Sequence, residues 1–394
     1  MAQASARFAP QGLLALLLLL APLARADCGP GALCHLNGVC SAGACASCYA
    51  PWQGATCGEL RLLPIAAPAA ENGFPGAGHP NASTWGGNAV RYQGQWHGYF
   101  SEMVNNCSLA QWGTNSQCVH AVASAPGGPY TRAGTAVHAW CHLPHVTLLP
   151  GAGAGGSDLF ALWHAGLGAT PAGSLVQCNA SGAPAAAQQP RQRRASGEPN
   201  IIHTAPSPYG PWTQSQAPLP DCWSPSPLRL RNGTFVALCG WTSLWAAPSL
   251  FGPWVHVLEV PTGGTPGTFE DPTIFQDPRG ALHVLWHTYT MDGIVPYSVS
   301  GHSFSADGLT WHSSNVQPYG ATANVTDGTV LAMSTRERPK VVFDPDTGAP
   351  THLITAVCPV PQCAPQAAIQ CKVQGVAANQ GYWTHTLVQE LDYS

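Results

Sequence analysis

Apolar and polar positions along the chain form a phrase that occurs four times: a proline opens an apolar strand, a turn follows, and a second apolar strand comes after it. The four copies begin at Pro144 (PHVTLLP), Pro227 (PLRLRNGTFVALCG), Pro272 (PTIFQDPRGALHVLWH) and Pro339 (PKVVFDPDTGAPTHLITAV). Short apolar runs bounded by turn residues are typical of strands. The pattern therefore predicts an all-β protein built from repeated strand pairs.

A second phrase lies between or after these pairs. It reads SAPGGPYT at 124–131, SPYGPWT at 207–213, SLFGPWV at 249–255 and, more loosely, SADGLTW at 305–311. A repeated supersecondary unit marks a radial or stacked architecture, and an all-strand unit with a long, uneven period favours propeller blades. A β-sandwich or two smaller barrels is the alternative, but neither would repeat the two phrases in alternation.

Residues 76–394 are enough for five four-stranded blades. We place the blades at 85–131, 139–212, 222–254, 269–311 and 336–391. The last strand is expected to pair with strands of blade one, which would remove the open edges of the sheets. Trp212 and Trp254, from the second phrase, are expected to pack between blades.

One stretch, at about 180–199, is rich in Ala, Pro, Gln and Ser and contains the basic run Arg191 to Arg194. This composition predicts a flexible insertion between strands. Cleavage by a processing protease at Arg194 is the alternative.

The first 26 residues have the form of a secretory signal peptide. Arg7 provides a basic start, Leu13 to Leu20 is apolar, and Ala24-Arg25-Ala26 is a cleavage site. An uncleaved membrane anchor is the alternative, but the apolar run is shorter than the roughly 20 residues that span a bilayer. We therefore predict a secreted protein without a transmembrane segment.

Composition agrees with export and excludes one class of partner. The chain has 15 cysteines, too many for a reducing compartment unless they bind metal. Its Asn-x-Ser/Thr sequons predict glycosylation at Asn81, Asn106, Asn179, Asn232 and Asn324. The formal net charge of −4, with no broad basic surface, argues against nucleic acid as a partner.

Six cysteines crowd into the segment that follows the signal peptide: Cys28, Cys34, Cys40, Cys45, Cys48 and Cys57. A segment this short cannot bury a sufficient hydrophobic core, so disulfides are expected to hold it. Metal binding is the weaker alternative in an exported chain, and spacing alone leaves the pairing open.

The sequences CHLNGVC (34–40) and CYAPWQGATC (48–57) resemble an epidermal growth factor-like domain. The resemblance implies the pairs Cys28–Cys40, Cys34–Cys45 and Cys48–Cys57, within a module spanning 27–58. Two residues, where the family usually has one, separate Cys45 from Cys48. Only Asp27 precedes the first cysteine, so we expect a spacer or adhesion element that binds no calcium, joined to the propeller by a linker at 59–75.

Nine cysteines lie outside this module. Local spacing suggests Cys107–Cys118, and either Cys358–Cys371 or Cys358–Cys363. Because the count is odd, at least one thiol is expected to be free or bonded to another chain.

Carboxylates are scarce in the chain, and three of them fall on strands that would line the propeller axis. Aligned on the prolines, the preceding residues are Leu143, Ser226, Asp271 and Arg338, and those two before are His142, Pro225, Glu270 and Glu337. Blade one has no such proline and offers Asn88, with Glu102 at the end of its second strand. Glycoside hydrolysis needs two carboxyl groups, one protonated and one ionised.

The blade phrases resemble five-bladed propeller glycosidases, glycoside hydrolase family 43 and its arabinanase, xylosidase and fructosidase relatives. The matching pieces, within 85–390, are Glu270-Asp271-Pro272 with Asp277-x-x-Gly280, Arg336-Glu337-Arg338-Pro339, and the Gly-Pro-Trp phrases. The resemblance implies that Glu337 is the general acid and Asp271 tunes its pKa. Blade one reads Ser83-Thr84-Trp85-Gly86-Gly87-Asn88 where the family has its base, so Glu270 and Glu102 are the base candidates.

Several other residues are candidates for contact with a sugar. We single out His142, His287, Arg338, Trp85 and Asn88, and consider Trp140 and Trp223 as further stacking surfaces. Zinc at His138, His142 and His145, or at His283 and His287, is the weaker alternative. On a strand, His142 and His145 point to opposite faces, and His283 and His287 share a face but lie far apart for joint coordination. We expect no metal or other cofactor, although the family resemblance admits a structural calcium in the channel.

These features together predict a secreted, carbohydrate-active glycoside hydrolase whose partner is a glycan or polysaccharide. The alternative is a non-catalytic carbohydrate-binding or adhesion protein on the same fold. A second carboxylate facing Glu337 at about 5–10 Å would favour hydrolysis. An ion pair of Glu337 with Arg336 or Arg338, without a second acid nearby, would favour binding.

Overall fold

The computed structural model describes residues 34–69, 72–76, 82–168, 175–180, 182–183, 201–215, 219, 222, 224–240, 242–263, 268–289, 299–359 and 383–394. Several predicted features lie outside these residues: the signal peptide, Cys28, Asn81, the Arg191 to Arg194 run, Trp223, Cys363 and Cys371. Within the described ranges, no helix is long and apolar enough to cross a membrane.

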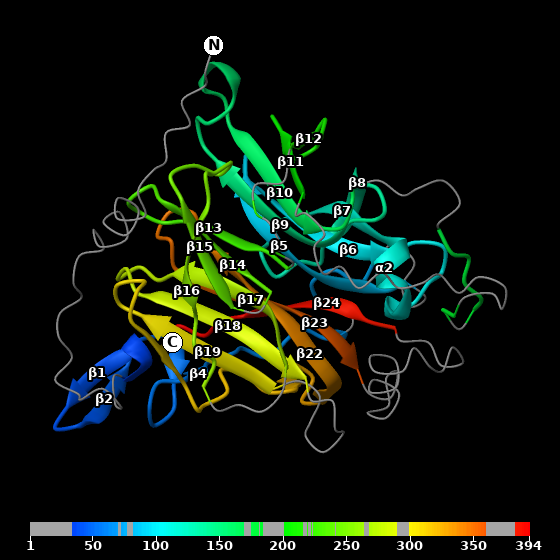
Figure 1. Cartoon of the computed structure of the whole chain (residues 1–394). Helices are drawn as coiled ribbons and strands as arrows, with labels where there is room; N and C mark the ends of the chain where they lie inside the picture. The colour runs from blue at the N-terminus through cyan, green and yellow to red at the C-terminus, as the bar shows by residue number, and fades with distance from the viewer. Residues whose placement is uncertain are drawn as a thin grey trace, which may run out of the picture.

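Five four-stranded antiparallel sheets make up most of the described chain (Figure 1). Blade one contains β5 (Thr84–Tyr92), β6 (Gln95–Met103), β7 (Ser116–Ala123) and β8 (Thr131–Val137). Blade two contains β9 (His142–Leu149), β10 (Leu159–Ala165), β11 (Ile201–Ala205) and β12 (Thr213–Ser215). Blade three contains β13 (Ser226–Arg229), β14 (Phe235–Cys239), β15 (Ser243–Ala247) and β16 (Val255–Glu259). Short helical turns are η3 (Leu109–Gln111), α2 (Trp112–Asn115) and η4 (Ala154–Gly156).

The last two sheets carry most of the scarce acids. Blade four contains β17 (Thr268–Gln276), β18 (Leu282–Tyr289), β19 (Val299–Ser305) and β20 (Trp311–Ser313). Blade five contains β21 (Thr322–Asn324), β22 (Val330–Phe343), β23 (Pro350–Pro359) and β24 (His385–Glu390). The long strand β22 pairs with β21 near its start and with β23 along the rest of its length.

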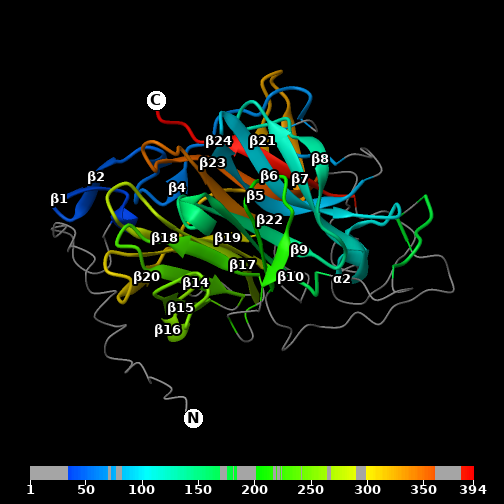
Figure 2. The same ribbon diagram turned by 90° about the horizontal axis from the view of Figure 1, so that it is seen from above.

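A closed ring of inner strands confirms the five-bladed propeller. Each of β5, β9, β13 and β17 contacts the next, β17 contacts β22, and β22 contacts β5 again. Figure 2 shows these sheets side by side around the molecule. Trp212 packs edge-on against Tyr99 of blade one, and Trp254 against Trp163 of blade two, so both pack between blades as predicted.

The ring closes differently from the prediction. β24 pairs with β23 inside blade five and meets blade one chiefly at its start, where the Thr84 N–H donates to the Thr384 carbonyl. The outer edge of β24 is bridged instead at Leu62–Leu391 and Phe74–Thr386. The predicted linker at 59–75 therefore supplies partners for backbone groups that would otherwise form an open sheet edge.

The cysteine-rich module consists of η1 (Cys34–Leu36), β1 (Gly38–Ser41), β2 (Ala44–Cys48), β3 (Trp52–Gln53) and β4 (Glu59–Leu60). Disulfides Cys34–Cys45 and Cys48–Cys57 confirm two predicted pairs. The module does not stand apart as a spacer: Trp52 and Leu60 share a buried cluster with Phe275, Leu285 and Tyr319. In Figure 1 its blue strands lie at the rim beside blade four.

The disulfides of the propeller correct another prediction. Cys107 bonds Cys178 and Cys118 bonds Cys141, so the predicted Cys107–Cys118 pair is wrong. Cys118 lies on β7 and Cys141 directly precedes β9, so this bond ties blade one to blade two. Proximity in sequence misled because the pairing follows contacts between blades. Cys222–Cys239 lies within blade three, and Cys358 is also disulfide-bonded.

Candidate active site

The inner strands carry a repeated backbone irregularity at one end. Leu143, Asp271 and Arg338, each followed by proline, have φ of 60°, 54° and 56°, and Gly86 in blade one has 60°. The pairing of each inner strand with its neighbour shifts register at these places. A proline has no N–H to donate to the ladder, and the resulting β-bulge redirects the side chains around it.

Blade three departs from this arrangement. Ser226 and Pro227 stay in regular register with Leu238 and Ala237. The positive φ of 54° falls instead at Ser224. The alignment on prolines therefore holds in the backbone of blades two, four and five, and blade one achieves the same bulge with glycine.

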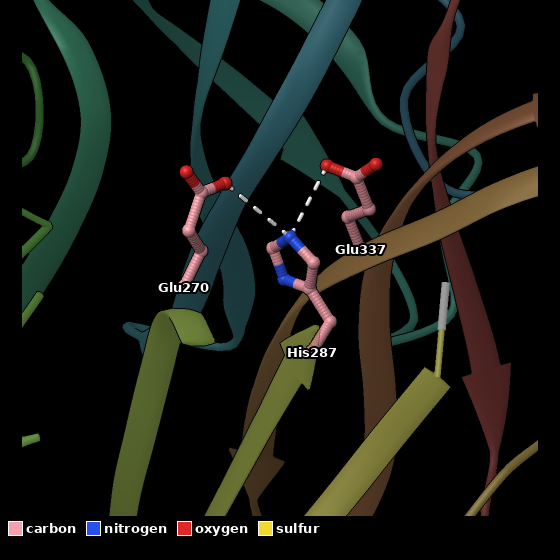
Figure 3. A group of neighbouring side chains, drawn as sticks. All are labelled: Glu270, His287 and Glu337. Carbon is pink, nitrogen blue, oxygen red and sulfur yellow. Dashed lines mark ion pairs between the residues drawn. The ribbon is translucent and has the colours of Figure 1, made fainter. Parts of the chain in front are cut away.

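Glu270 and Glu337 stand directly before the bulges of blades four and five, and both face His287 of β18. The Nε2 atom of His287 lies 3.6 Å from a Glu270 oxygen and 3.3 Å from a Glu337 oxygen. One atom from each of the three side chains fits within 4.8 Å of the others. Figure 3 shows the imidazole between the two carboxylates. The cluster therefore joins two neighbouring blades through one ring.

Asp271 and Arg338, the bulge residues themselves, form a second pair beside this cluster. The guanidinium donates to Asp271 Oδ1 at 2.7 Å, and the Ser224 hydroxyl donates to the same atom at 2.6 Å. Asp271 also lies 3.8 Å from Nε2 of His287. The Arg338 guanidinium sits 5.6 Å from the Trp85 ring of blade one. Arg338 thus pairs with Asp271, and the ion pair of Glu337 is with His287.

The protonation of His287 depends on opposing neighbours. Burial alone would lower its pKa, but the Glu337 carboxylate, with Glu270 and Asp271, raises the pKa to about 9. The backbone N–H of Arg338 points at Nδ1 from 3.3 Å and opposes a second proton there. The carboxylates dominate, because they carry full charges and this hydrogen bond is long. In either charge state, Nε2 carries a hydrogen, and this nitrogen lies within ion-pair distance of the carboxylates without a well-aligned hydrogen bond to any of them.

This hydrogen bears on metal binding. Two carboxylates and an imidazole are a donor set that divalent cations use. While the Arg338 N–H occupies Nδ1, however, Nε2 is protonated and cannot ligate a cation. The buried Lys340 ammonium also donates to the Pro272 carbonyl at 3.0 Å, within the ring of inner strands. A cation ligated by Nε2 of His287 would therefore require the loss of this proton.

Two of the residues that were predicted to contact a sugar make contacts within the protein instead. His142 is 1% exposed, its Nδ1 lies 2.7 Å from the Ser116 hydroxyl, and its ring stacks on Trp112. Burial, with the nearby Arg338 charge, lowers its pKa well below the usual value. The Asn88 side chain accepts a hydrogen bond from the Val146 N–H and donates one to the Val146 carbonyl, so it links blade one to blade two.

Glu102 belongs to a different part of blade one. Its Oε1 accepts hydrogen bonds from Arg132 on the outer strand β8, at 3.1 Å, and from Gln117 on β7, at 3.2 Å. The strand pairing turns this side chain toward the outer strands of its own blade. Glu102 is therefore not brought to the Glu270–His287–Glu337 cluster, which corrects its prediction as a base.

Sequence reasoning missed two residues of this region. Ser224 fixes Asp271, although nothing in its surrounding sequence distinguishes it from other serines. Lys340 directly follows the proline of blade five, and burial lowers its pKa to about 7. Its place after an aligned proline is the signal that could have pointed to the channel.

Comparisons with known proteins bear on the fold. No family model and no curated protein matches the chain. Among solved structures, an endo-1,4-β-xylanase from Bacteroides thetaiotaomicron is 12% identical, with 84% of this chain and 92% of that chain covered and a TM-score of 0.49. A thermostable family-43 glycoside hydrolase is 10% identical, with 85% and 93% covered and a TM-score of 0.49.

The catalytic domain of a GH62 α-L-arabinofuranosidase from Coprinopsis cinerea is also similar, at 10% identity, with 85% and 98% covered and a TM-score of 0.48. At such identities and TM-scores these matches carry no argument about activity. The assignment of this chain as a five-bladed propeller rests on its own strand pairing and closed inner ring.

Proposed function

We propose that the protein is a secreted glycoside hydrolase that uses Glu337 and Glu270 as its carboxyl pair. The observation that carries the proposal is their convergence: two acids from neighbouring blades, each directly before a bulge, share one imidazole within 4.8 Å. Burying two carboxylates costs folding free energy, so such a pair in a chain with few acids indicates a chemical use. The predicted signal peptide and the disulfides support secretion.

The two carboxylates differ in exposure, and this difference suggests their roles. The Glu337 side chain is 1% exposed and Glu270 is 16% exposed. Glu337, next to the hydrogen on Nε2 of His287, is placed to receive a proton and pass it to the leaving group. Glu270 faces solvent more and is placed to meet the sugar. Asp271 and Ser224 hold Arg338 in position beside them.

The distance between the acids restricts the mechanism. Inverting enzymes separate their carboxyl groups by about 6.5–9.5 Å, so that a water molecule fits, whereas retaining enzymes use about 5–5.5 Å. One oxygen atom of Glu270 and one of Glu337 lie within 4.8 Å of each other, which is nearer to the retaining than to the inverting separation. If this pair acts together, we expect Glu270 to serve as nucleophile and the anomeric configuration to be retained.

The test is a screen of the purified full chain against aryl glycosides and plant and algal polysaccharides. Glu337→Gln and Glu270→Gln should each lower activity by about 10²–10⁴-fold, the range for a lost acid–base group. Glu102→Gln is the matched control and should leave activity within about twofold of the parent, because Glu102 lies outside the cluster. Activity that survives both cluster substitutions would retire the assignment.

A non-catalytic glycan-binding role is the second candidate, and one observation favours it. The blade-one bulge carries Trp85, Gly86 and Gly87 and no carboxylate, so the acids come from blades four and five alone. A binder would show saturable glycan binding by calorimetry with no product released. In that case Glu337→Gln would alter affinity and nothing else.

A further inference from the structure

Away from the candidate active site, the cysteine-rich module meets blade four through a stack of rings. Trp52 of the module lies parallel to His302 of β19, with centroids 4.8 Å apart and planes at 23°. His302 in turn stacks on His283 of β18 at 5.2 Å. His35 of the module approaches His302 edge-on at 5.9 Å. Three imidazoles and an indole therefore form the centre of this interface.

His283 and His302 are hydrogen-bonded to each other, and His283 also faces one carboxylate. Nδ1 of His283 lies 3.0 Å from Nε2 of His302. On its other side, Nε2 of His283 lies 3.7 Å from Asp277. Asp277 is also paired with Arg279, whose guanidinium sits 4.0 Å from the Tyr49 ring of the module. Tyr393 is in electrostatic reach of Asp277 and Arg279, and the Arg231 guanidinium donates to the Asp277 carbonyl at 2.9 Å.

Burial makes a positive charge unfavourable at this interface. His283 and His302 are fully buried and Trp52 is 4% exposed. Burial lowers the pKa of His35, of His283 and, most strongly, of His302, and the histidines repel one another's charge. Asp277 offsets this effect for His283, its direct neighbour, and a hydrogen bond with the Cys57 backbone partly offsets it for His35, whereas His302 faces imidazoles and aromatic rings.

We propose that this contact is an acid-released latch: the module is docked on blade four while His35 and His302 are neutral, and it detaches when the medium is acidified. The latch consists of His35, Trp52, His283 and His302. It is independent of the proposed hydrolase activity, because none of these residues belongs to the Glu270–His287–Glu337 cluster.

The size of the effect follows from proton linkage. In the detached state, His35 and His302 meet water and recover a pKa near the ordinary 6.5. Each of these histidines binds a proton only when the module is detached. Lowering the pH from 7.5 to 5.5 should therefore raise the equilibrium constant for detachment by about tenfold for each histidine, and by about 100-fold for the two together. His283 contributes little to this pH dependence, because it stays beside Asp277 whether the module is docked or detached.

Blade one contains an internal control for the same chemistry. His97 and His120 stack at 5.1 Å and are joined by a ring-nitrogen contact of 2.9 Å. This pair is covered by Tyr209 of the same propeller rather than by the module. It reports how a buried histidine pair responds to acid in the absence of a docked domain.

The experiment is hydrogen exchange of the full chain at pH 7.5 and 5.5, corrected for intrinsic exchange rates. Amides of residues 34–60 should open about 100-fold more at pH 5.5, while amides of β6 and β7 change much less. His35→Gln with His302→Gln should remove most of this difference. His35→Gln alone should reduce it to about tenfold, and this variant leaves the buried stack of blade four intact.

Two results would overturn the proposal. One is hydrogen exchange of the module that is independent of pH, or that changes with pH to the same extent as hydrogen exchange of β6 and β7 in blade one. The other is an undiminished pH response in the His35→Gln variant. His120→Gln, which alters the blade-one pair only, should keep the full response of the module.

Discussion

His283 and His287 lie four residues apart on the same strand, are both fully buried, and respond to their surroundings in opposite ways. His287 faces three carboxylates, which overcome burial and raise its pKa to about 9. His283 faces one carboxylate and another imidazole, and burial lowers its pKa. The comparison shows that burial penalises charge in both places, and that the number of opposing charges decides which protonation state the fold favours.

The largest expected effect comes from removing the cation that the carboxylates share. His287→Leu leaves Glu270, Asp271 and Glu337 with less compensation, and breaking a buried ion pair in this way costs about 3–5 kcal/mol. Denaturant unfolding would measure the loss. His283→Leu, the matched change on the same strand, should cost less, about 1–3 kcal/mol, since it leaves one hydrogen-bonding partner unsatisfied. Equal losses for the two variants would remove the distinction between these sites.

The pH dependence of stability should show the raised pKa of His287 directly. A pKa raised from 6.5 to about 9 means that the folded state binds the proton more tightly. This stabilisation is full below pH 6.5 and is lost as the pH rises through about 9, on the order of 3 kcal/mol in total. Thermal unfolding measured from pH 6 to 9.5 checks this loss of stability, and the His287→Leu variant should lack most of it.

Removing one of the carboxylates should shift the balance by a smaller amount. Glu337→Gln keeps the shape of the side chain but deletes the nearest negative charge, at 3.3 Å from Nε2. The pKa of His287 should fall by about one unit or more, equivalent to about 1.4 kcal/mol. A histidine titration followed by NMR would measure it. His283, near the other end of β18, should keep its titration, and a shift there instead would contradict the separation of the two sites.

The smallest expected effect tests the blade-one bulge that supports Arg338. Gly86 has φ of +60°, and a Cβ there would lie 3.2 Å from Cδ of Arg338. Gly86→Ala should destabilise the protein by about 1 kcal/mol and disturb Arg338, whose N–H faces His287. Gly94→Ala is the control: φ is +83° with nothing within 4 Å, so only the backbone strain is added. If both variants lower the unfolding free energy equally, the contact with Arg338 contributes nothing.

Local patterns in the chain were sufficient for much of the architecture. Proline and glycine phrases identified the blades because a bulge and a turn each demand particular residues wherever they occur. The same logic aligned Asp271 with Arg338 and Glu270 with Glu337, and these positions are equivalent in the backbone. The pairs Cys34–Cys45 and Cys48–Cys57 were implied by the resemblance to an epidermal growth factor-like domain, since spacing alone left the pairing open.

Contacts between distant segments were not accessible in this way. Cys118 bonds Cys141 rather than Cys107, and Glu102 is turned to Arg132 of its own blade. The segment at 59–75, expected as a linker, forms backbone bridges at the outer edge of β24. Each of these outcomes depends on which strands the closed ring brings together, and no local pattern carries that information.

The chain by itself determined that the protein is a ring of five small sheets and which positions of blades two, four and five are equivalent, since strand alternation, proline and glycine act over a few residues. Only the folded structure decided that His287 of blade four meets Glu337 of blade five, and that His283, on the same strand, meets the module instead. Charge and desolvation act through space, so the protonation of two similar histidines was settled by neighbours far away in the sequence.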